Sequence, residues 1–381
     1  MLQRKCYRYH LYPTKTQAEG LQWVLDRCRE MYNAALQERR DAYQMASAKV
    51  SYYAQKRELP GVKKDCPEFK QVGSQVLQDV LKRVDLAFQA FFRRVRAGEK
   101  PGYPRFKSRN RYDSFTYSQA GWKLPEDDGR LVLAGIGALK VRWSRPIQGT
   151  IKTVTIHRSA DQWHMCFSCV LHVPQPTAPD RPATALDVGL EYFATLADGS
   201  HIDNPRYFRE AEDLLARRQR RRDRKKRGSK NRRRANLLVA KAHRHIRNKR
   251  RDFHHQQARK IVDRHGAIAV EGLCIKNMVR HHSLAKSIAD AGWNQFVTIL
   301  TTKAEEAGLV VVVVNPAGTS QVCSGCRRPV PKTLSDRWHT CPYADCGLSL
   351  QRDHNSAREI LNRAGLARAV AIAPVAEFHR L

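Results

Sequence analysis

The stretch ALDVGLEYFATLADG, residues 185–199, decides the fold class of this chain. It predicts an apolar strand, a tight turn at Gly189 and a second apolar strand. Two later apolar runs, AIAVEGL at 267–273 and LVVVVVN at 309–315, predict two more buried strands with helices between them. Because strands and helices alternate over long segments, we expect an α/β domain over residues 181–381.

Three acidic residues stand out within these elements. Asp187 is expected to emerge from the middle of the first strand, Glu271 follows AIAV at the end of another, and Asp353 in QRDHNSAREI opens the last amphipathic helix. A single acid of this kind is usually a helix cap or a surface residue, so the hypothesis depends on all three together. If the three residues converge, their carboxylates can hold two Mg²⁺ ions, and a pair of such ions supports cleavage of a phosphodiester bond. We therefore predict Asp187, Glu271 and Asp353 as catalytic residues and Mg²⁺ ligands.

Four of the ten cysteines have the spacing of a metal site. Cys323 and Cys326 form a C-x2-C pair, and Cys341 and Cys346 form a C-x4-C pair. Paired thiolates of this kind suit one structural, tetrahedral Zn²⁺ ion. Because the second pair is two residues longer than the usual C-x2-C, His339 stays open as a substitute ligand.

The other six cysteines are predicted to pack rather than to bind metal, and the four single ones are expected to be small buried side chains. Cys166 and Cys169 lie on one predicted strand, where positions three apart point to opposite faces, which favours packing over metal binding. The remaining four occur singly in apolar surroundings: Cys6, Cys28, Cys66 and Cys274. The N-terminus lacks the apolar stretch of a secretory signal, so we expect a reducing compartment without disulfides.

The charge of the chain points to a polyanionic partner. Its 381 residues include 69 Lys or Arg against 36 Asp or Glu, a formal charge of +33. Nucleic acid is favoured over anionic lipid, because no basic amphipathic anchor is evident and the longest apolar run, 309–314, is too short to span a membrane.

Thirteen of the twenty-one residues at 214–234 are Lys or Arg. The flanking residues have helical spacing, so we predict a basic helical hairpin over 206–256 that binds a nucleic-acid backbone; a solvated basic arm is the alternative. The candidate contacts are Arg217, Arg218, Arg220, Arg221, Arg222, Arg224, Lys225, Lys226 and Arg227.

The N-terminal half has a different pattern. Residues 1–13 predict a strand, and Thr14 or Thr16 is expected to cap a helix that continues to about residue 43. A second helix is predicted over 74–95, and from about 112 the apolar residues alternate as in strands. We expect a β-rich module, residues 1–13 and 100–180, with a helical insertion at 14–99.

These motifs together resemble the TnpB family, the OrfB-type proteins of bacterial insertion sequences, which are related to type V CRISPR effectors. The resemblance covers the chain broadly and in order. It is carried by LYPTKTQ at 11–17, YNAAL at 32–36, PGYPRFK at 101–107, ALDVGLEYFATLADG at 185–199, IRNKRRDFHHQ at 246–256, VEGLCIKNM at 270–278, SIADAGW at 287–293, SQVCSGC at 320–326 and RDHNSA at 352–357.

The resemblance implies an architecture. Residues 181–381 would form an RNase H-like RuvC nuclease domain with a zinc ribbon inserted at 319–349 and a tail at 364–381 expected to be disordered. The β-rich module would be a β-barrel-like wedge, and residues 14–99 a recognition lobe. Gln351 stands where the family's DRD-x-N motif has its first Asp, while Asp353 keeps the position of the metal ligand.

The resemblance also implies a function. Such proteins are RNA-guided DNA endonucleases that bind a guide RNA from the transposon end and cut double-stranded target DNA beside a short flanking motif. Base pairing supplies the sequence specificity, and Lys and Arg hold the heteroduplex by its backbone. Ser74 and Gln78 are candidates for reading the flanking motif. We expect a bacterial cytoplasmic protein, nucleoid-associated when bound to DNA, with neither a membrane nor a small-molecule substrate as partner.

Two alternatives from other classes stay open. One is a guide-dependent DNA-binding repressor whose nuclease is inactive, which the presence of all three acids disfavours. The other is a basic RNA-binding protein with a zinc ribbon, for which DNA binding would not depend on a guide. A nucleotide-driven motor is disfavoured, because no G-x-x-x-x-G-K-[ST] loop is present.

Overall fold

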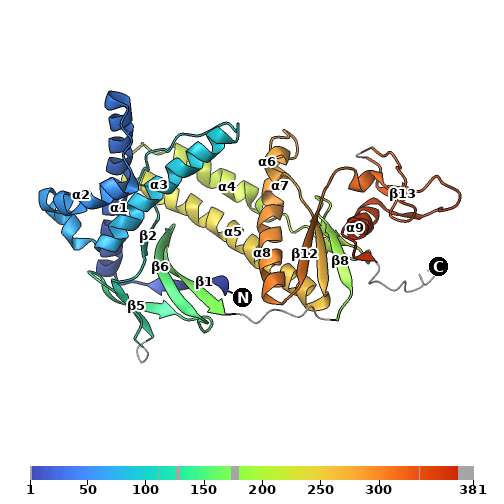
Figure 1. Cartoon of the computed structure of the whole chain (residues 1–381), viewed down its shortest axis with the longest axis horizontal. Helices are drawn as coiled ribbons and strands as arrows, with labels where there is room; N and C mark the ends of the chain where they lie inside the picture. The colour runs from blue at the N-terminus through green and yellow to red at the C-terminus, as the bar shows by residue number, and fades with distance from the viewer. Residues whose placement is uncertain (1, 110, 126–128, 173–179, 334, 368–381) are drawn as a thin grey trace. The chain divides into compact units, whose positions relative to one another are not determined.

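A computed structural model describes residues 2–109, 111–125, 129–172, 180–333 and 335–367. The chain divides into two compact units, Met1–Val173 and Pro174–Leu381 (Figure 1).

The first unit is built on a seven-stranded antiparallel sheet in the order β2-β6-β7-β1-β5-β4-β3. The alternating sequence pattern predicts this, since one face of the sheet is buried and the other is not. The strands are β1 (Leu2–Tyr12), β2 (Ser114–Tyr117), β3 (Trp122–Lys123), β4 (Arg130–Leu133), β5 (Gly137–Arg142), β6 (Thr150–Ser159) and β7 (Gln162–His172). The first strand of the chain therefore lies between β7 and β5, with four later strands outside them.

The helices of this unit all lie in sequence between β1 and β2. They are α1 (Lys15–Ala46), α2 (Tyr52–Asp65), the 3₁₀ helix η1 (Pro67–Gln71) and α3 (Ser74–Arg96). Helix α1 begins where Thr14 and Gln17 form a capping box, which satisfies two backbone N–H groups at once. The apolar faces of α1 and α3 share one core with the inner face of the sheet. Helix α2, whose interior contains Pro60, was not predicted from the sequence.

The single cysteines are less uniform than predicted. Cys28 is buried and Cys66 partly buried, but Cys6 and Cys274 are exposed, so the prediction of burial was wrong for these two. Cys6 lies on the outward side of the alternation in β1, and Cys274 precedes the short helix α6 (Ile275–Met278) outside any apolar face. Cys169 is buried and Cys166 is not, as expected for positions three apart on β7.

The second unit contains a mixed five-stranded sheet in the order β10-β9-β8-β11-β12. Strands β8 (Ala183–Asp187), β11 (Ala267–Glu271) and β12 (Val310–Val314) are parallel, whereas β9 (Tyr192–Leu196) and β10 (His201–Asp203) are antiparallel to their neighbours. The four predicted strands are therefore confirmed as β8, β9, β11 and β12. The prediction that the run at 309–315 is buried was wrong, because β12 is an edge strand in which Val310 is 56% and Val313 64% exposed.

Helices cover both faces of this sheet. On one face Ile268 and Val270 of β11 pack in the core that contains α5 (Lys230–Arg264) and α8 (Trp293–Glu306). On the other face Ala185 and Ala269 pack against α9 (Arg352–Arg363). The remaining elements are α4 (Tyr207–Asp223), α7 (Ala285–Ala291), the 3₁₀ helix η2 (Thr319–Gln321), β13 (Trp338–Thr340) and β14 (Ser349–Gln351).

Helices α4 and α5 form the predicted basic hairpin, and α5 continues eight residues beyond the predicted end at 256. Most of the C-terminal tail, for which disorder was predicted, lies outside the described residues. Among the described residues, no helix is long and apolar enough to cross a membrane.

Candidate functional site

The three predicted acids come from elements that meet at one edge of the second sheet. Asp187 is the last residue of β8 and Glu271 the last residue of β11. These strands are parallel, with Leu186 paired with Val270, so the two acids end neighbouring strands at the same edge. Asp187 therefore lies at the end of its strand, and the prediction that it emerges from the middle was wrong.

The alternation of side chains turns these acids toward α9. Ala185 and Ala269 face α9, and side chains two positions apart on a strand share a face, so Asp187 and Glu271 follow them. Asp353 is the second residue of α9, which packs on β8. Its Oδ2 atom would lie 3.9 Å from a Cβ placed at Gly189, just after β8.

The electrostatics of Asp187 agree with this convergence. Burial raises the pKa of the Asp187 carboxyl well above its ordinary value, and the negative charges of Glu271 and Asp353 raise it further. Arg352 and a hydrogen bond from Ser356, both on α9, act in the opposite direction. Burial also raises the pKa of Asp353. Two neighbouring carboxylates thus oppose the ionisation of Asp187, in addition to its burial.

Glu271 has a dedicated hydrogen-bond donor. The Thr319 hydroxyl donates to Glu271 Oε1 over 2.5 Å, and Thr319 is only 5% exposed. Burial raises the pKa of Glu271, whereas the bond from Thr319 and the charge of Arg363 lower it. Thr319 was not predicted from the sequence, since a threonine in the PAGTS turn carries no spacing that marks it as a partner of Glu271.

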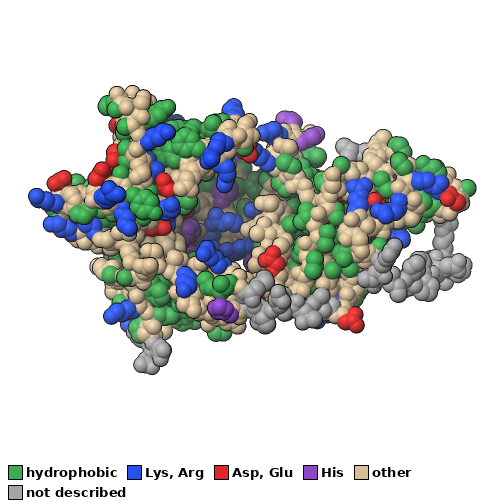
Figure 2. Space-filling model, viewed as in Figure 1, with side chains coloured by type: hydrophobic (Ala, Val, Ile, Leu, Met, Phe, Trp, Pro, Cys, Tyr) green, Lys and Arg blue, Asp and Glu red, His purple; other side chains and the backbone are tan. Residues whose placement is uncertain are grey.

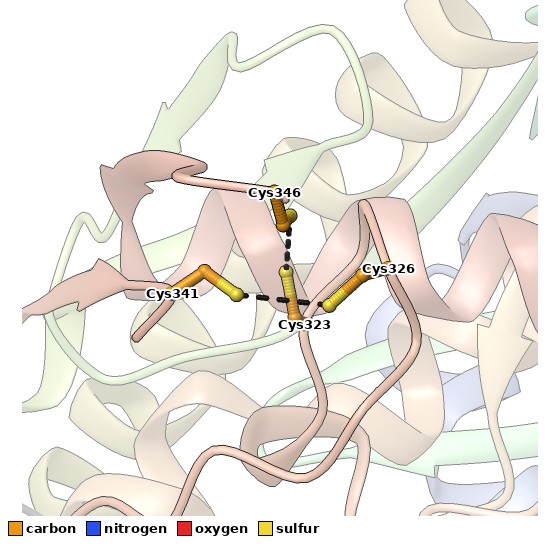
Figure 3. Close-up of side chains that lie close together, drawn as sticks. All are labelled: Cys323, Cys326, Cys341 and Cys346. Atoms are coloured by element: carbon orange, nitrogen blue, oxygen red, sulfur yellow. Dashed lines mark hydrogen bonds between the residues drawn. The ribbon is translucent and has the colours of Figure 1, made fainter. Parts of the chain in front are cut away.

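The four predicted cysteines converge in the loops between β12 and α9 (Figure 3). Their sulfur atoms all lie within 4.8 Å of one another, with 3.7 Å between Cys323 and Cys346 and 3.6 Å between Cys326 and Cys341. Zn–S bonds of about 2.3 Å in a tetrahedron place sulfurs about 3.8 Å apart, so this set fits one zinc ion. Among the described residues, no other group of three or more potential ligands is this compact.

Two neighbouring residues refine this picture. A side chain at Gly325 would place its Cβ 3.1 Å from Cys346 Sγ, so glycine leaves room for the thiolates. His339 is fully buried, and burial, followed by the charge of Lys332, lowers its pKa to about 4. Its ring nitrogens lie outside the compact group, so the four cysteines form the set without His339 as a substitute.

The cysteine loops are fastened to the helix that carries Asp353. Asn355 of α9 is fully buried and accepts a hydrogen bond from the Ser324 backbone N–H while donating to the Val322 carbonyl. About two turns later on α9, the Asn362 side chain donates a hydrogen bond to the Ser324 carbonyl over 2.8 Å. The first cysteine pair is thus anchored to α9 through its backbone.

The basic hairpin presents most of its predicted contacts to solvent. Seven of the nine side chains are exposed: Arg217, Arg220, Arg221, Arg224, Lys225, Lys226 and Arg227. Arg218 and Arg222 are partly buried and serve the hairpin itself, since Arg218 donates to the Leu238 carbonyl of α5 and Arg222 pairs with Asp223 at 2.9 Å. Lys and Arg side chains also occur over the face of the molecule drawn in Figure 2.

The two candidates for reading a flanking motif lie near the start of α3. Ser74 is exposed, and its hydroxyl accepts a hydrogen bond from Lys63 Nζ over 2.7 Å. Gln78 is half-buried one turn later.

Three family descriptions match the chain. "Probable transposase" (OrfB_IS605) matches residues 166–282, "Cas12f1-like, TNB domain" matches 293–360, and "Helix-turn-helix domain" matches 1–47. The last range folds here as β1 and α1 rather than as two helices joined by a turn.

Named relatives match over almost the whole length. A Streptomyces pristinaespiralis protein named "Putative RNA-guided DNA endonuclease" is 33% identical, over 96% of this chain and 90% of its own. An Escherichia coli (strain K12) protein, "Putative RNA-guided DNA endonuclease InsQ", is 30% identical, over 95% of this chain and 92% of its own.

Among solved structures, a Cas12f1 chain from a cryo-EM structure of a Cas12f1-sgRNA-target DNA complex has a similar fold. Its TM-score is 0.56 at 14% identity, and the match covers 91% of this chain and 82% of that one. The full-length relatives, the family matches and the placement of the acids and cysteines agree: this chain belongs to the TnpB family.

Proposed function

We propose that this protein is an RNA-guided DNA endonuclease that binds a guide RNA from the end of its transposon and cuts double-stranded target DNA beside a short flanking motif. The observation that carries the proposal is the placement of Asp187 and Glu271 at the carboxyl ends of adjacent parallel strands, under the helix that bears Asp353. The names of the two full-length relatives point to the same activity.

The donor set suits magnesium. Asp187, Glu271 and Asp353 offer only carboxylate oxygens, the ligands that Mg²⁺ prefers. A bound pair of Mg²⁺ ions would supply an activated water and would stabilise the leaving oxygen. Burial, followed by the charges of Glu271 and Asp353, raises the pKa of Asp187. Without cations the ionised acids would also repel a phosphate. The Thr319 hydroxyl fixes one oxygen of Glu271 and leaves the other for a metal.

The rest of the nuclease reaction requires that the strands be held in place. In our proposal base pairing between guide and target supplies the sequence specificity, and the exposed cations of the α4–α5 hairpin bind phosphates of the duplex. The four cysteines would hold one structural Zn²⁺, which has no open position for catalysis because all four ligands come from the protein.

The deciding experiment is cleavage by the purified protein with its copurifying RNA. Because the flanking motif is unknown, the substrate is a plasmid library that carries the matched target beside randomised bases. We expect Mg²⁺-dependent cutting by the wild type and none by Asp187→Ala, with guide and target binding retained in both.

Glu305→Ala is the matched control, because Glu305 is an exposed acid at the end of α8, just before β12 begins. Target binding without cutting by the wild type in Mg²⁺ or Mn²⁺ would favour the guide-dependent repressor. DNA binding that ignores the guide sequence would favour a plain RNA-binding protein.

A further inference from the structure

Aromatic side chains gather at the end of α3 and in the loop that follows it. Phe88, Phe91 and Phe92 lie on the last turns of α3, and the Tyr103 ring contacts Phe88 and Phe91 edge-on, with centroids 5.6 and 5.4 Å apart. Phe92 is 53% exposed, Tyr103 45% and Phe106 45%. Large rings are seldom left this accessible in one place without a partner to cover them.

The loop that carries Tyr103 and Phe106 is held in a fixed position. Asn33 of α1 donates to the Lys107 carbonyl over 3.0 Å and accepts from the Lys107 N–H over 2.8 Å. Arg109 pairs with Asp26 of the same helix at 3.2 Å. The two rings are therefore presented by a fastened loop, which lowers the entropy lost when a ligand binds.

A cleft of about 460 Å³ lies beside these rings. Tyr103, Arg105 and Phe106 of the loop line this cleft. Leu36 and Arg40 of α1 also line it. Arg40 and Arg105 are exposed. Flat apolar rings therefore share one cleft with two guanidinium groups.

The charge around the cleft selects the class of partner. Residues 93–109 contain seven Lys or Arg and a single acid, Glu99. A second copy of this chain, which carries a net charge of +33, would bring like charge to the surface. Exposed aromatic rings beside cations are what single-stranded nucleic acid requires, since its bases stack and its phosphates pair with arginine.

We propose that Tyr103 and Phe106 form a stacking site for unpaired nucleobases, with Arg40 and Arg105 holding the adjoining phosphates. The site would take single-stranded DNA or RNA of any sequence, because every base offers a stacking face. This proposal rests on the proposed function only for the source of the single strand, which would be an unpaired part of the guide RNA or of the target DNA. Its role is separate from pairing and from cleavage.

The first test compares two fluorescent oligonucleotides with the same number of phosphates, an oligothymidylate and an abasic deoxyribose-phosphate strand. Phosphate contacts are equal for both, so the ratio of their Kd values reports stacking. We expect the wild type to bind the oligothymidylate at least about fivefold more tightly, since one stacked base contributes about 1 to 3 kcal/mol. Tyr103→Ala/Phe106→Ala should reduce this ratio toward one, whereas Tyr103→Phe/Phe106→Tyr should keep it.

Tyr53→Ala is the matched control, because Tyr53 is an exposed aromatic residue on α2 of the same unit. Thermal melting of every variant checks that folding is unchanged. A ratio that the double alanine variant leaves unaltered, in a folded protein, would overturn the proposal.

The second test locates the base. Oligonucleotides with 5-iodouracil are cross-linked by light to the full-length protein, and we expect the modified peptide to contain residues 101–107. Cross-links that fall only elsewhere would overturn the proposal. The proposal would also be overturned if sedimentation velocity showed a dimer that Tyr103→Ala dissociates while the ratio of the two Kd values stays unchanged. Asp187→Ala should cross-link like the wild type, because stacking does not depend on cleavage. If the wild type cross-links but does not cut DNA, only the nuclease proposal is contradicted.

Discussion

The Ser324 backbone N–H donates to Asn355 Oδ1 over 2.9 Å, and Asn355 Nδ2 donates to the Val322 carbonyl over 2.7 Å. The first of these residues lies within the Cys323–Cys326 pair, and the second lies two positions after Asp353 on α9. One buried amide thus connects the cysteine site to the helix that carries Asp353.

Replacing Asn355 by alanine should destabilise the protein and reduce cleavage. The change leaves the buried Ser324 N–H and the partly buried Val322 carbonyl without this partner, and an unmet buried group costs about 1 to 3 kcal/mol. Thermal melting and guided cleavage measure the two effects. Asn362→Ala removes one bond of 2.8 Å and should have a smaller effect. Equal melting temperatures for the Asn355 variant and the wild type would contradict the assigned role.

Loss of the structural metal should reduce cleavage as well as local folding. Cys323→Ser removes one of four thiolates, so mass spectrometry of the native protein should find less than one zinc per chain. Because Asn355 joins the cysteine loop to α9, the cleavage rate should fall with the zinc content. Cys274→Ser, at an exposed cysteine outside the cluster, is the control and should keep both. Full zinc content in the Cys323 variant would show that the metal is bound elsewhere.

Thr319→Val should raise the Mg²⁺ concentration needed for cleavage. The hydroxyl donates to Glu271 and lowers the pKa of that carboxyl, so its loss raises the pKa further above the ordinary value. The acid limb of the pH–rate profile should therefore move to higher pH. A hydrogen bond to a charged group contributes about 1.5 to 3 kcal/mol, which corresponds to a loss of roughly tenfold or more.

Thr319→Ser should restore most of the activity, because serine keeps the hydroxyl. Calorimetry of Mn²⁺ binding gives a readout apart from cleavage. If the valine and serine variants have the same pH profile, Thr319 acts only through packing.

Without Mg²⁺, Asp187→Asn should stabilise the protein near neutral pH. The pKa of Asp187 is raised in the folded state, so the native protein binds more protons than the unfolded chain between the two pKa values. The contribution of Asp187 to the free energy of unfolding therefore falls as pH rises through this window. The asparagine of the variant does not ionise, so the variant does not lose this stability. Melting temperatures measured across pH in Mg²⁺-free buffer test this, and added Mg²⁺ should favour the wild type instead. A lower melting temperature for the variant at every pH would contradict the argument.

Arg221→Ala in the hairpin should weaken nucleic-acid binding evenly across sequences. Arg221 is exposed, so its loss should reduce the slope of log Kd against log salt by about one phosphate contact. Arg218→Ala makes the useful comparison, because Arg218 donates to the Leu238 carbonyl and should lower hairpin stability as well. An unchanged salt slope for Arg221→Ala would place the phosphate contacts elsewhere.

The sequence predicted those features that depend on local pattern. Apolar periodicity and motif spacing predict the strand that contains Asp187, the strand that ends at Glu271, the helix that begins beside Asp353 and the cysteine cluster. Helix α2 was missed because Pro60 is a strong helix breaker, and here the flanking turns and the packing of the helix outweigh it.

Features that depend on distant partners could not be predicted. The pairing of Thr319 with Glu271 joins residues 48 positions apart, and the use of Arg218 inside the hairpin depends on how α4 meets α5. The exposure of Cys6 depends on which face of β1 packs against the helices. Each requires the assembled fold, since neither periodicity nor composition distinguishes these residues from their neighbours.

The central position of β1 has a consequence during synthesis. This strand is synthesised before both of its partners, β5 and β7, and the pairing with β7 extends to His172. At about 5 to 20 residues per second, β1 has to wait roughly 8 to 30 s for that partner. Until β5 and β7 are synthesised, the edges of β1 that pair with them are open to another chain. Helices α1 and α3 are synthesised between β1 and β7, and they need only local contacts to form. They can therefore cover the apolar face of β1 until β5 and β7 pair with it.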